Sequence, residues 1–229
     1  MNNKLLYNVG SICLMLFLIL FSVFTVVNDL DFFSEQYVKN GADSMTGMSF
    51  EDLDKATIML LDYLNDERDN LDMQAEEFGK MAETFDEREK MHMVDVKVLY
   101  QNFATVMNIL IGMTCAFFMF LFVRDRSNFL NGFAKGLTVA MAIALVLCLA
   151  FGFVFTVGFD SFWTMFHKVM FTNDLWLLNP KISTMINMFP LNFWLAMCSK
   201  ILIRFAVLFG LLFAGARLGL NFACRKEKV

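Results

Sequence analysis

The run from Thr84 to Val123 constrains the fold of this chain more than any other stretch. It begins among charged residues, and no Pro or Gly interrupts it before its apolar half is reached. Thr84 and Glu87 have the spacing of a capping box, in which each side chain hydrogen-bonds a free amide at the start of a helix. From Asp86 onward such a helix would be about 57 Å long at ~1.5 Å per residue, longer than a bilayer core requires. The sequence therefore predicts one helix that crosses a membrane and continues beyond it, carrying His92.

The distribution of charge separates a membrane part of the chain from an acidic part. The chain has 229 residues, 58% of them hydrophobic, with 28 Phe and a mean hydropathy of +0.55. A water-soluble domain of this size could not bury so much apolar surface. Residues 28–104 hold 19 Asp and Glu against 7 Lys and Arg, whereas the rest of the chain holds 4 against 12. We expect an integral membrane protein with a small acidic domain outside the bilayer, and no nucleic-acid partner, because the sequence has no basic, aromatic-interleaved stripe.

Four apolar runs are long enough to cross a bilayer. The first could be mistaken for a signal peptide, but it is too long and lacks a small-x-small cleavage signature before Asn28, so we expect it to remain uncleaved. Basic residues at Lys4, Arg124–Arg126 and Arg225–Lys228 place both termini and the short second connection in the cytoplasm by the positive-inside rule. The four predicted spans are Leu5–Val27, Ala104–Val123, Leu137–Val157 and Ile201–Leu220.

The predicted fold class is an all-α or mainly α integral membrane protein with four transmembrane helices and a small acidic extracytoplasmic domain. In that domain Ser49 and Asp52 mark a helix start, and the apolar positions of residues 50–64 recur with a helical period. Residues 65–70 form a polar turn, and the sequence leaves residues 71–83 open. The predicted organisation is a first span at 1–27, the extracytoplasmic domain at 28–103, two spans and a cytoplasmic loop at 104–158, an interfacial loop at 159–199, and the fourth span with a basic tail at 200–229.

The loop between the third and fourth spans is unusually rich in aromatic residues. Residues 159–171 are too apolar to be solvated and too polar to span a bilayer. This composition is typical of an amphipathic segment that lies in the plane of the membrane interface. The segment carries His167, the second of the two histidines in the chain.

The sequence offers neither a cofactor motif nor an activated nucleophile. None of the five cysteines falls in the acidic domain, and no CxxC or cysteine–histidine cluster suggests a disulfide framework or a zinc site. No serine or cysteine sits in a nucleophile motif such as G-x-S-x-G. We therefore expect no cofactor and no metal.

Both histidines fall on the predicted extracytoplasmic side, where an imidazole that titrates near neutrality can act as a general acid or base. Asp95 lies three residues after His92 and shares its helix face, so its carboxylate could fix the tautomer of the ring. Lys168 and Arg204 are placed to meet a lipid phosphate or an oxyanion. Pattern alone also allows plainer roles, in which His92 and His167 are interfacial amphipathic residues and Asp95 is a solvated helix residue.

Two sequence segments favour the catalytic roles of the histidines over these plainer roles. Residues 85–99 contain Arg-Glu-x-x-His-Met-x-Asp-Val-Lys, and residues 162–180 contain Phe-His-Lys-x-x-Phe-x-Asn-x-x-Trp. Together with the order of spans along nearly the whole chain, they resemble the bacterial lipoprotein intramolecular transacylase family. The resemblance implies that His92 and His167 are catalytic. The supporting or substrate-binding candidates are Asp95, Lys168, Asn173, Trp176 and Arg204.

The resemblance also implies a substrate and a reaction. The substrate would be a lipoprotein whose N-terminal cysteine carries diacylglycerol and a free α-amine, and the enzyme would move the sn-2 acyl chain to that amine to give the lyso-form lipoprotein. We hypothesise that His92, oriented by Asp95, takes the amine proton, while His167 polarises the carbonyl or protonates the leaving oxygen. We expect a monomer in the plasma membrane of a Gram-positive bacterium, with membrane lipid and the lipoprotein as its partners.

Three other functions fit parts of the sequence. An intermolecular acyltransferase with a phospholipid donor would usually need a covalent acyl carrier or a second lipid site. A haem or copper protein could use the two histidines as ligands. A membrane accessory or sensor protein could use the acidic domain to bind a partner.

Overall fold

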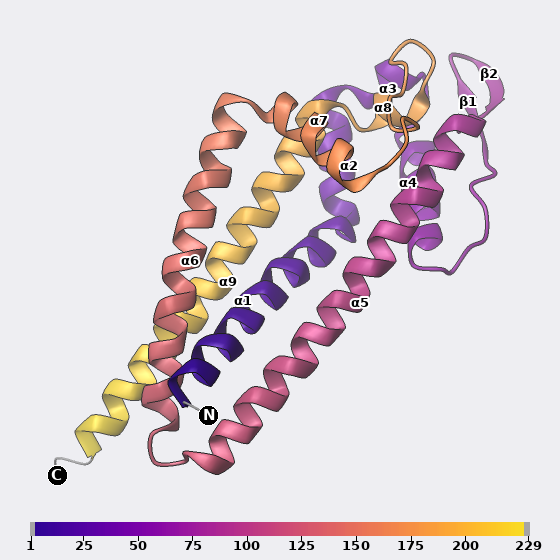
Figure 1. Ribbon diagram of the computed structural model, residues 1–229. Helices are drawn as coiled ribbons and strands as arrows, with labels where there is room; N and C mark the ends of the chain where they lie inside the picture. The colour runs from indigo at the N-terminus through magenta and orange to yellow at the C-terminus, as the bar shows by residue number, and fades with distance from the viewer. Residues whose placement is uncertain (1–2, 227–229) are drawn as a thin grey trace. The chain divides into compact units, whose positions relative to one another are not determined.

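The structure is a computed structural model that describes residues 3–226, with side chains through Phe222 (Figure 1). The basic tail predicted at Arg225–Lys228 lies outside the residues whose side chains are described. The chain divides into two compact units. The span unit comprises Met1–Phe24, Ala104–Val154 and Ser199–Val229, and the histidine unit comprises Thr25–Phe103 and Phe155–Cys198.

Four helices of the described chain are long and apolar enough to cross a membrane. The prediction of a mainly α membrane protein with four spans is confirmed, because each predicted span falls within one of these helices. Their bounds are α1 Asn3–Val27, α5 Glu87–Arg124, α6 Phe129–Val157 and α9 Leu191–Lys226.

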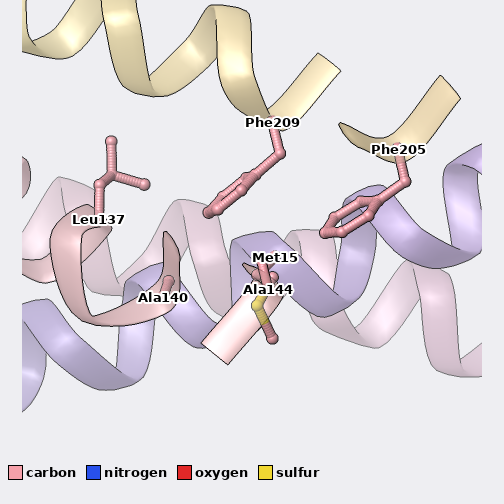
Figure 2. Close-up of a cluster of buried hydrophobic side chains, with 6 residues drawn as sticks. All are labelled: Met15, Leu137, Ala140, Ala144, Phe205 and Phe209. Carbon is pink, nitrogen blue, oxygen red and sulfur yellow. The ribbon is translucent and has the colours of Figure 1, made fainter. Parts of the chain in front are cut away.

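The core of the span unit joins α1, α6 and α9 through close-packed apolar side chains. Figure 2 shows the aromatic rings of α9 beside small and branched side chains of α6, with one methionine from α1. Alanines on α6 let the neighbouring backbones approach, which is how helices pack where lipid removes the hydrophobic driving force. The buried members of this cluster are Met15, Leu137, Ala140, Ala144, Phe205 and Phe209.

Two glycines bring α6 against α1. Gly132 and Gly136 are four residues apart on α6, the G-x-x-x-G spacing of close helix pairs. A Cβ atom at Gly132 would lie 2.2 Å from the ring of Tyr7, and one at Gly136 would lie 2.6 Å from Ser11 Oγ. No side chain fits at either position without a shift, so the packing of α1 on α6 depends on these glycines.

The start of α5 differs from the predicted capping box. The helix begins at Glu87, and its cap is formed by Asp86 and Glu89, each of which accepts a hydrogen bond from the backbone N–H of the other (2.8 and 2.7 Å). Thr84 instead ends the preceding hairpin, where its N–H donates to Met73, and its hydroxyl has no hydrogen-bond partner among the described residues. Both pairs have capping-box spacing, and the fold of the hairpin decided between them.

The histidine unit contains the predicted helix of residues 50–64, which is confirmed as α4, Phe50–Leu64. Ser49 caps it by accepting from the N–H of Asp52, as the sequence predicted. The helix packs on α2, Leu30–Asn40, which follows the cap residue Asp29. Tyr37 of α2 is fully buried and hydrogen-bonds the hydroxyl of Thr57 in α4.

Residues 71–83, which the sequence left open, contain a two-stranded antiparallel hairpin. Strand β1, Gln74–Glu77, pairs with β2, Lys80–Glu83. The turn residues Phe78 and Gly79 have φ angles of 50° and 80°, as a two-residue hairpin turn with positive φ at both central positions requires. The first position usually holds Asn, Asp or Gly, so the phenylalanine at this position gave no sequence signal for a hairpin turn.

The interfacial loop predicted at 159–199 is mostly helical. Its amphipathic segment forms α7, Phe159–Met170, and a short helix α8, Thr184–Met188, packs near α3, Ala42–Thr46. Helix α9 begins at Leu191, well before the predicted start of the fourth span. The residue before it is Pro190, whose fixed φ suits a helix N-terminus and whose carbonyl accepts from the N–H of Phe193.

Candidate active site

The fold of the histidine unit brings the two histidines together. His92 lies in the first turns of α5, and His167 lies near the end of α7. Their ring centroids are 6.2 Å apart, with the ring planes tilted by 34°. The ring of Phe171 contacts both, at 5.2 Å from His92 and 5.7 Å from His167. The structure thus places the two sequence-predicted residues in one site.

Both histidines line an apolar cavity of about 480 Å³, within the roughly 300–1,000 Å³ typical of ligand pockets. Every residue of its lining belongs to the histidine unit. Almost all of the lining is aliphatic or aromatic, so the cavity suits an apolar ligand. Residues that line it from α4, α5, α7, the following loop and α9 include Leu60, Leu64, Met93, Val96, Phe103, Trp163, Phe166, Leu177 and Trp194.

His167 is held in one tautomer by its own helix. Its Nδ1 lies 2.8 Å from the carbonyl oxygen of Trp163, one turn earlier. A carbonyl only accepts, so Nδ1 donates its hydrogen and the neutral ring keeps its lone pair on Nε2. The indole rings of Trp163 and Trp176 pack on the imidazole at 4.8 and 4.9 Å.

His92 is almost fully buried, with an exposed fraction of 7%. Its Nδ1 is buried and has no hydrogen-bond partner among the described residues. The predicted hydrogen bond to Asp95 is therefore wrong, since the carboxylate of Asp95 accepts instead from Nδ2 of Asn173 at 2.8 Å. Facing the same side of a helix did not suffice, because the loop that follows α7 supplies Asn173 as the partner of the carboxylate.

The environment keeps both imidazoles neutral at pH 7. Burial lowers the pKa of His92 to about 4, the charge of His167 lowers it further, and the nearby carboxylate of Asp95 opposes this shift. Burial also lowers the pKa of His167, while the hydrogen bond to the carbonyl of Trp163 raises it. A neutral imidazole can accept a proton or donate a hydrogen bond.

Polar contacts attach the loop that follows α7 to α5, among them an ion pair between Arg88 and Asp174 at 3.4 Å. Asn173 donates to Asp95, and the guanidinium of Arg88 donates to the backbone carbonyl of Asp174. Nε1 of Trp176 donates to the carbonyl of Asn173 at 3.0 Å, which sets the indole over the ring of His167. Of the supporting residues named from the sequence, Trp176 thus contacts His167, and Asp95 and Asn173 hold the loop that carries it.

The other two supporting residues are not part of this group. Lys168 is exposed on α7 and does not line the apolar cavity. Arg204 lies on α9 in the span unit.

Three aromatic residues of the site are not among the candidates named from the sequence. Trp163 and Trp194 stack with ring centroids 4.7 Å apart in the cavity wall, and Phe171 contacts both histidines. The sequence placed Trp163 in the aromatic segment of the membrane interface and gave it no role in the site. Its spacing of four residues before His167, on one helix face, was the available signal.

Glu89 was also missed, although it fixes the geometry next to His92. Its carboxylate is 1% exposed and accepts from Ser183 Oγ at 2.5 Å, from the N–H of Met185 at 2.8 Å and from the N–H of Asp86. Burial raises the pKa of Glu89, and these hydrogen bonds oppose the shift. The contact ties the start of α8 to the start of α5.

In the described residues 3–222, no group of three or more His, Cys, Asp or Glu side chains is placed to hold a metal ion. The two histidines have aromatic neighbours instead, in Phe171, Trp163 and Trp176.

The fold and the site together define the class of this chain. It is a multi-pass membrane protein in which two histidines line an apolar cavity. The sequence of residues 8–194 matches the family described as lipoprotein intramolecular transacylase Lit. The chain therefore belongs to this family of acyltransferases, and the resemblance stated from the sequence is confirmed.

Solved structures agree on the fold. A structure of the membrane integral lipoprotein intramolecular transacylase Lit from Bacillus cereus is 18% identical, covers 96% of this chain and 98% of its own, and has a TM-score of 0.77. A variant of that protein with one histidine changed to alanine is also 18% identical, covers 99% and 96%, and has a TM-score of 0.75. No curated protein sequence matches the chain.

Proposed function

We propose that this protein moves the sn-2 acyl chain of a diacylglyceryl-cysteine lipoprotein to the α-amine of the same cysteine, giving the lyso-form lipoprotein. The observation that carries the proposal is the pair of neutral imidazoles, 6.2 Å apart, in the wall of an apolar cavity of about 480 Å³. The cavity suits acyl chains, and the imidazoles suit a reaction that moves a proton. Membership of the transacylase family supports the same substrate class.

Alignment supplies much of the rate in such a reaction. The ester and the amine belong to one molecule, so the enzyme has only to hold them in an attacking geometry, which is worth roughly 7–11 kcal/mol of the barrier. No covalent acyl-enzyme is required, in keeping with a sequence that has no nucleophile motif. The amine nitrogen attacks the ester carbonyl, the new amide bond forms, and the bond to the glycerol oxygen breaks.

His167 acts as the base in our proposal. Its Nδ1–H donates to the carbonyl of Trp163, so the lone pair of Nε2 can take the proton that the attacking amine loses. The resulting imidazolium then gives this proton to the departing sn-2 oxygen, which leaves as a hydroxyl. The proton balance closes without a second base.

His92 stabilises the oxyanion of the tetrahedral intermediate in our proposal. A ring with a pKa of about 4 stays neutral and donates one N–H, and a donor in a water-poor cavity stabilises developing negative charge strongly. These roles are the reverse of those hypothesised from the sequence. The reason is that Asp95 pairs with Asn173, whereas the hydrogen bond that selects a tautomer belongs to His167.

The orientation of the protein follows from the charges of the connections. The end of α5 and its short connection to α6 carry Arg124 and Arg126, and the positive-inside rule favours the cytoplasmic side for such a connection. We propose that both termini share that side, and that residues 28–103 and 159–199 lie on the extracytoplasmic side of a bacterial plasma membrane. The site would then meet lipoproteins after they leave the cytoplasm.

The test is expression in a host that makes only diacylglyceryl lipoproteins, followed by mass spectrometry of the N-terminal lipopeptides. Wild-type protein is expected to yield N-acyl, S-monoacylglyceryl cysteine. His167→Ala and His92→Ala should each reduce this product at least 100-fold, because a general base or an oxyanion donor contributes about 10²–10⁴-fold to a rate. Lyso-form product at the wild-type rate in either variant would overturn the assignment.

Matched controls are available on the same helices. Met91 and Met165 are 54% and 67% exposed, stand near the two histidines in sequence, and do not line the cavity. Met91→Ala and Met165→Ala should therefore keep full activity. An isotope-labelled acyl chain on the substrate separates the alternative of an intermolecular acyltransferase, because intramolecular transfer keeps the label and the number of acyl chains within one molecule.

A further inference from the structure

A second, polar cavity of about 190 Å³ lies in the histidine unit and has no part in the mechanism above. Its walls come from α5, from the last residue of α7 and from the residues that follow α7. The polar side chains in these walls are Asp95, Asn102, Thr172 and Asn173. A carboxylate, two amides and a hydroxyl offer both donors and acceptors of hydrogen bonds.

The polar cavity adjoins the apolar one, because Leu99 and Phe171 line both. The ring of Phe171 is also the ring that contacts His92 and His167. A ligand that passes the edge of Phe171 therefore leaves the apolar cavity beside the histidine pair and meets polar side chains at once.

Hydrogen-bonding capacity in this cavity remains unfilled. Asp95 Oδ2 accepts from Asn173, but within the described part of the chain Oδ1 of Asp95 has no hydrogen-bond partner. The amide of Asn102 is exposed and likewise has no partner among the residues described. These groups can bind a polar ligand without first breaking contacts within the protein.

The substrate of the proposed reaction has a polar part that must leave the site at this point. Its acyl chains, its ester and its α-amine meet at one cysteine, from whose carbonyl the peptide chain continues. A peptide main chain cannot enter an apolar cavity without losing its hydrogen bonds to water, which costs several kcal/mol for each unpaired group. It needs hydrogen-bonding partners close to the reacting atoms.

We propose that the polar cavity binds the main chain of the residues that directly follow the acylated cysteine. Asp95 accepts a main-chain N–H, and Asn102 donates to a main-chain carbonyl. Main-chain recognition does not depend on the side chains of the lipoprotein. This inference rests on the proposed function. It means that the protein binds the peptide part of the lipoprotein as well as its acyl chains, ester and amine.

The test compares two synthetic substrates with the full-length protein in lipid vesicles. One is a diacylglyceryl-cysteine amide with no further residue, and the other carries a four-residue peptide after the cysteine. For the lipopeptide, Asn102→Ala should raise KM about tenfold and leave kcat unchanged, as expected for the loss of one hydrogen bond. Asp95→Ala also releases Asn173, so its effect is measured as the ratio of KM for the lipopeptide to KM for the cysteine amide, which should rise about tenfold. For the cysteine amide, Asn102→Ala should not change KM.

A modified substrate and a control variant sharpen the result. N-methylation of the residue after the cysteine removes the donor to Asp95. With wild-type protein, the ratio of KM for this lipopeptide to KM for the cysteine amide should therefore be raised, and Asp95→Ala should raise this ratio no further. Asp69 is an exposed carboxylate in the 65–70 turn, and Asp69→Ala should change nothing.

Two failures can be told apart. If wild-type protein converts neither substrate, the proposed function fails. If it converts both, but the variants change KM equally for both substrates or for neither, only the peptide-binding inference is overturned.

Discussion

At the scale of single residues, burial decides the protonation state of the site. His92 sits among apolar rings with its Nδ1 unpaired within the described residues, and this environment disfavours the charged imidazolium. His167 keeps one hydrogen bond to its own helix and is less buried. The two imidazole rings therefore differ in burial and in hydrogen bonding, although the sequence alone presents two equivalent histidines.

The lowered pKa of His92 predicts a pH-dependent stability. An unfolded histidine with a pKa near 6.5 binds a proton that the folded site, with a pKa of about 4, rejects. The contribution to the free energy of unfolding is therefore fully present above pH 6.5 and is lost progressively as the pH falls toward 4. Thermal unfolding in detergent between pH 7.5 and 5 should show a decrease in Tm that is smaller in His92→Phe. Parallel pH profiles for the two proteins would contradict this prediction.

Glu89 is the second residue whose burial has a measurable consequence. Glu89→Ala leaves a hydroxyl and two backbone N–H groups without their acceptor, at Ser183, Met185 and Asp86. We expect the free energy of unfolding to fall by about 3 kcal/mol or more, since each buried unpaired group costs about 1–3 kcal/mol. Denaturant unfolding measures the change. Glu87→Ala, which removes a carboxylate that is 86% exposed in the same helical turn, serves as the control and should be near neutral.

At the scale of elements, close approach between helices explains the glycines of α6. Gly132 and Gly136 face α1, and no Cβ fits at either position, whereas a Cβ at Gly152 on the same helix would meet nothing within 4 Å. One helix thus carries glycines with opposite roles. A packed interface requires the first two, and no contact requires the third.

This difference predicts opposite effects of one substitution. In a helix interior, Gly→Ala stabilises by about 0.5–1 kcal/mol when space allows. Gly152→Ala should therefore raise Tm slightly, whereas Gly136→Ala should lower it, because the new methyl group would meet the backbone carbonyl of Tyr7. Thermal unfolding of both variants in the same detergent tests the pair. Equal shifts would show that α1 and α6 do not depend on this contact.

At the scale of the whole molecule, the charge distribution and the four spans predict the orientation in the membrane. The acidic residues gather in 28–104, and basic residues mark the connection after α5. Loops without excess Lys or Arg are translocated more readily than basic ones.

Cysteine labelling in intact cells tests this orientation. In a background with the native cysteines changed to serine, Asp69→Cys should react with a membrane-impermeant maleimide from outside. Ser127→Cys, in the short connection between α5 and α6, should react only after lysis. The reverse pattern would invert the proposed topology and move the histidine site to the cytoplasmic side.

Local patterns were enough for much of the fold. Apolar run length determined the four spans, because a bilayer demands about 20 apolar residues from any helix that crosses it. The cap at Ser49 and the apolar period of α4 likewise depend on neighbours in the sequence. The hairpin that turns at Phe78 and Gly79 was not predicted, because Phe78 stands where such turns usually have Asn, Asp or Gly.

The sequence by itself determined the membrane class, the four spans and, through two specific segments, the family. Only the tertiary structure decided which groups meet: that Asp95 pairs with Asn173 and not with His92, and that the rings of His92 and His167 lie 6.2 Å apart. The physical reason is one of range. Helix and span formation follow from neighbours along the chain, whereas a hydrogen-bond partner and a buried pKa depend on side chains that folding brings from distant segments.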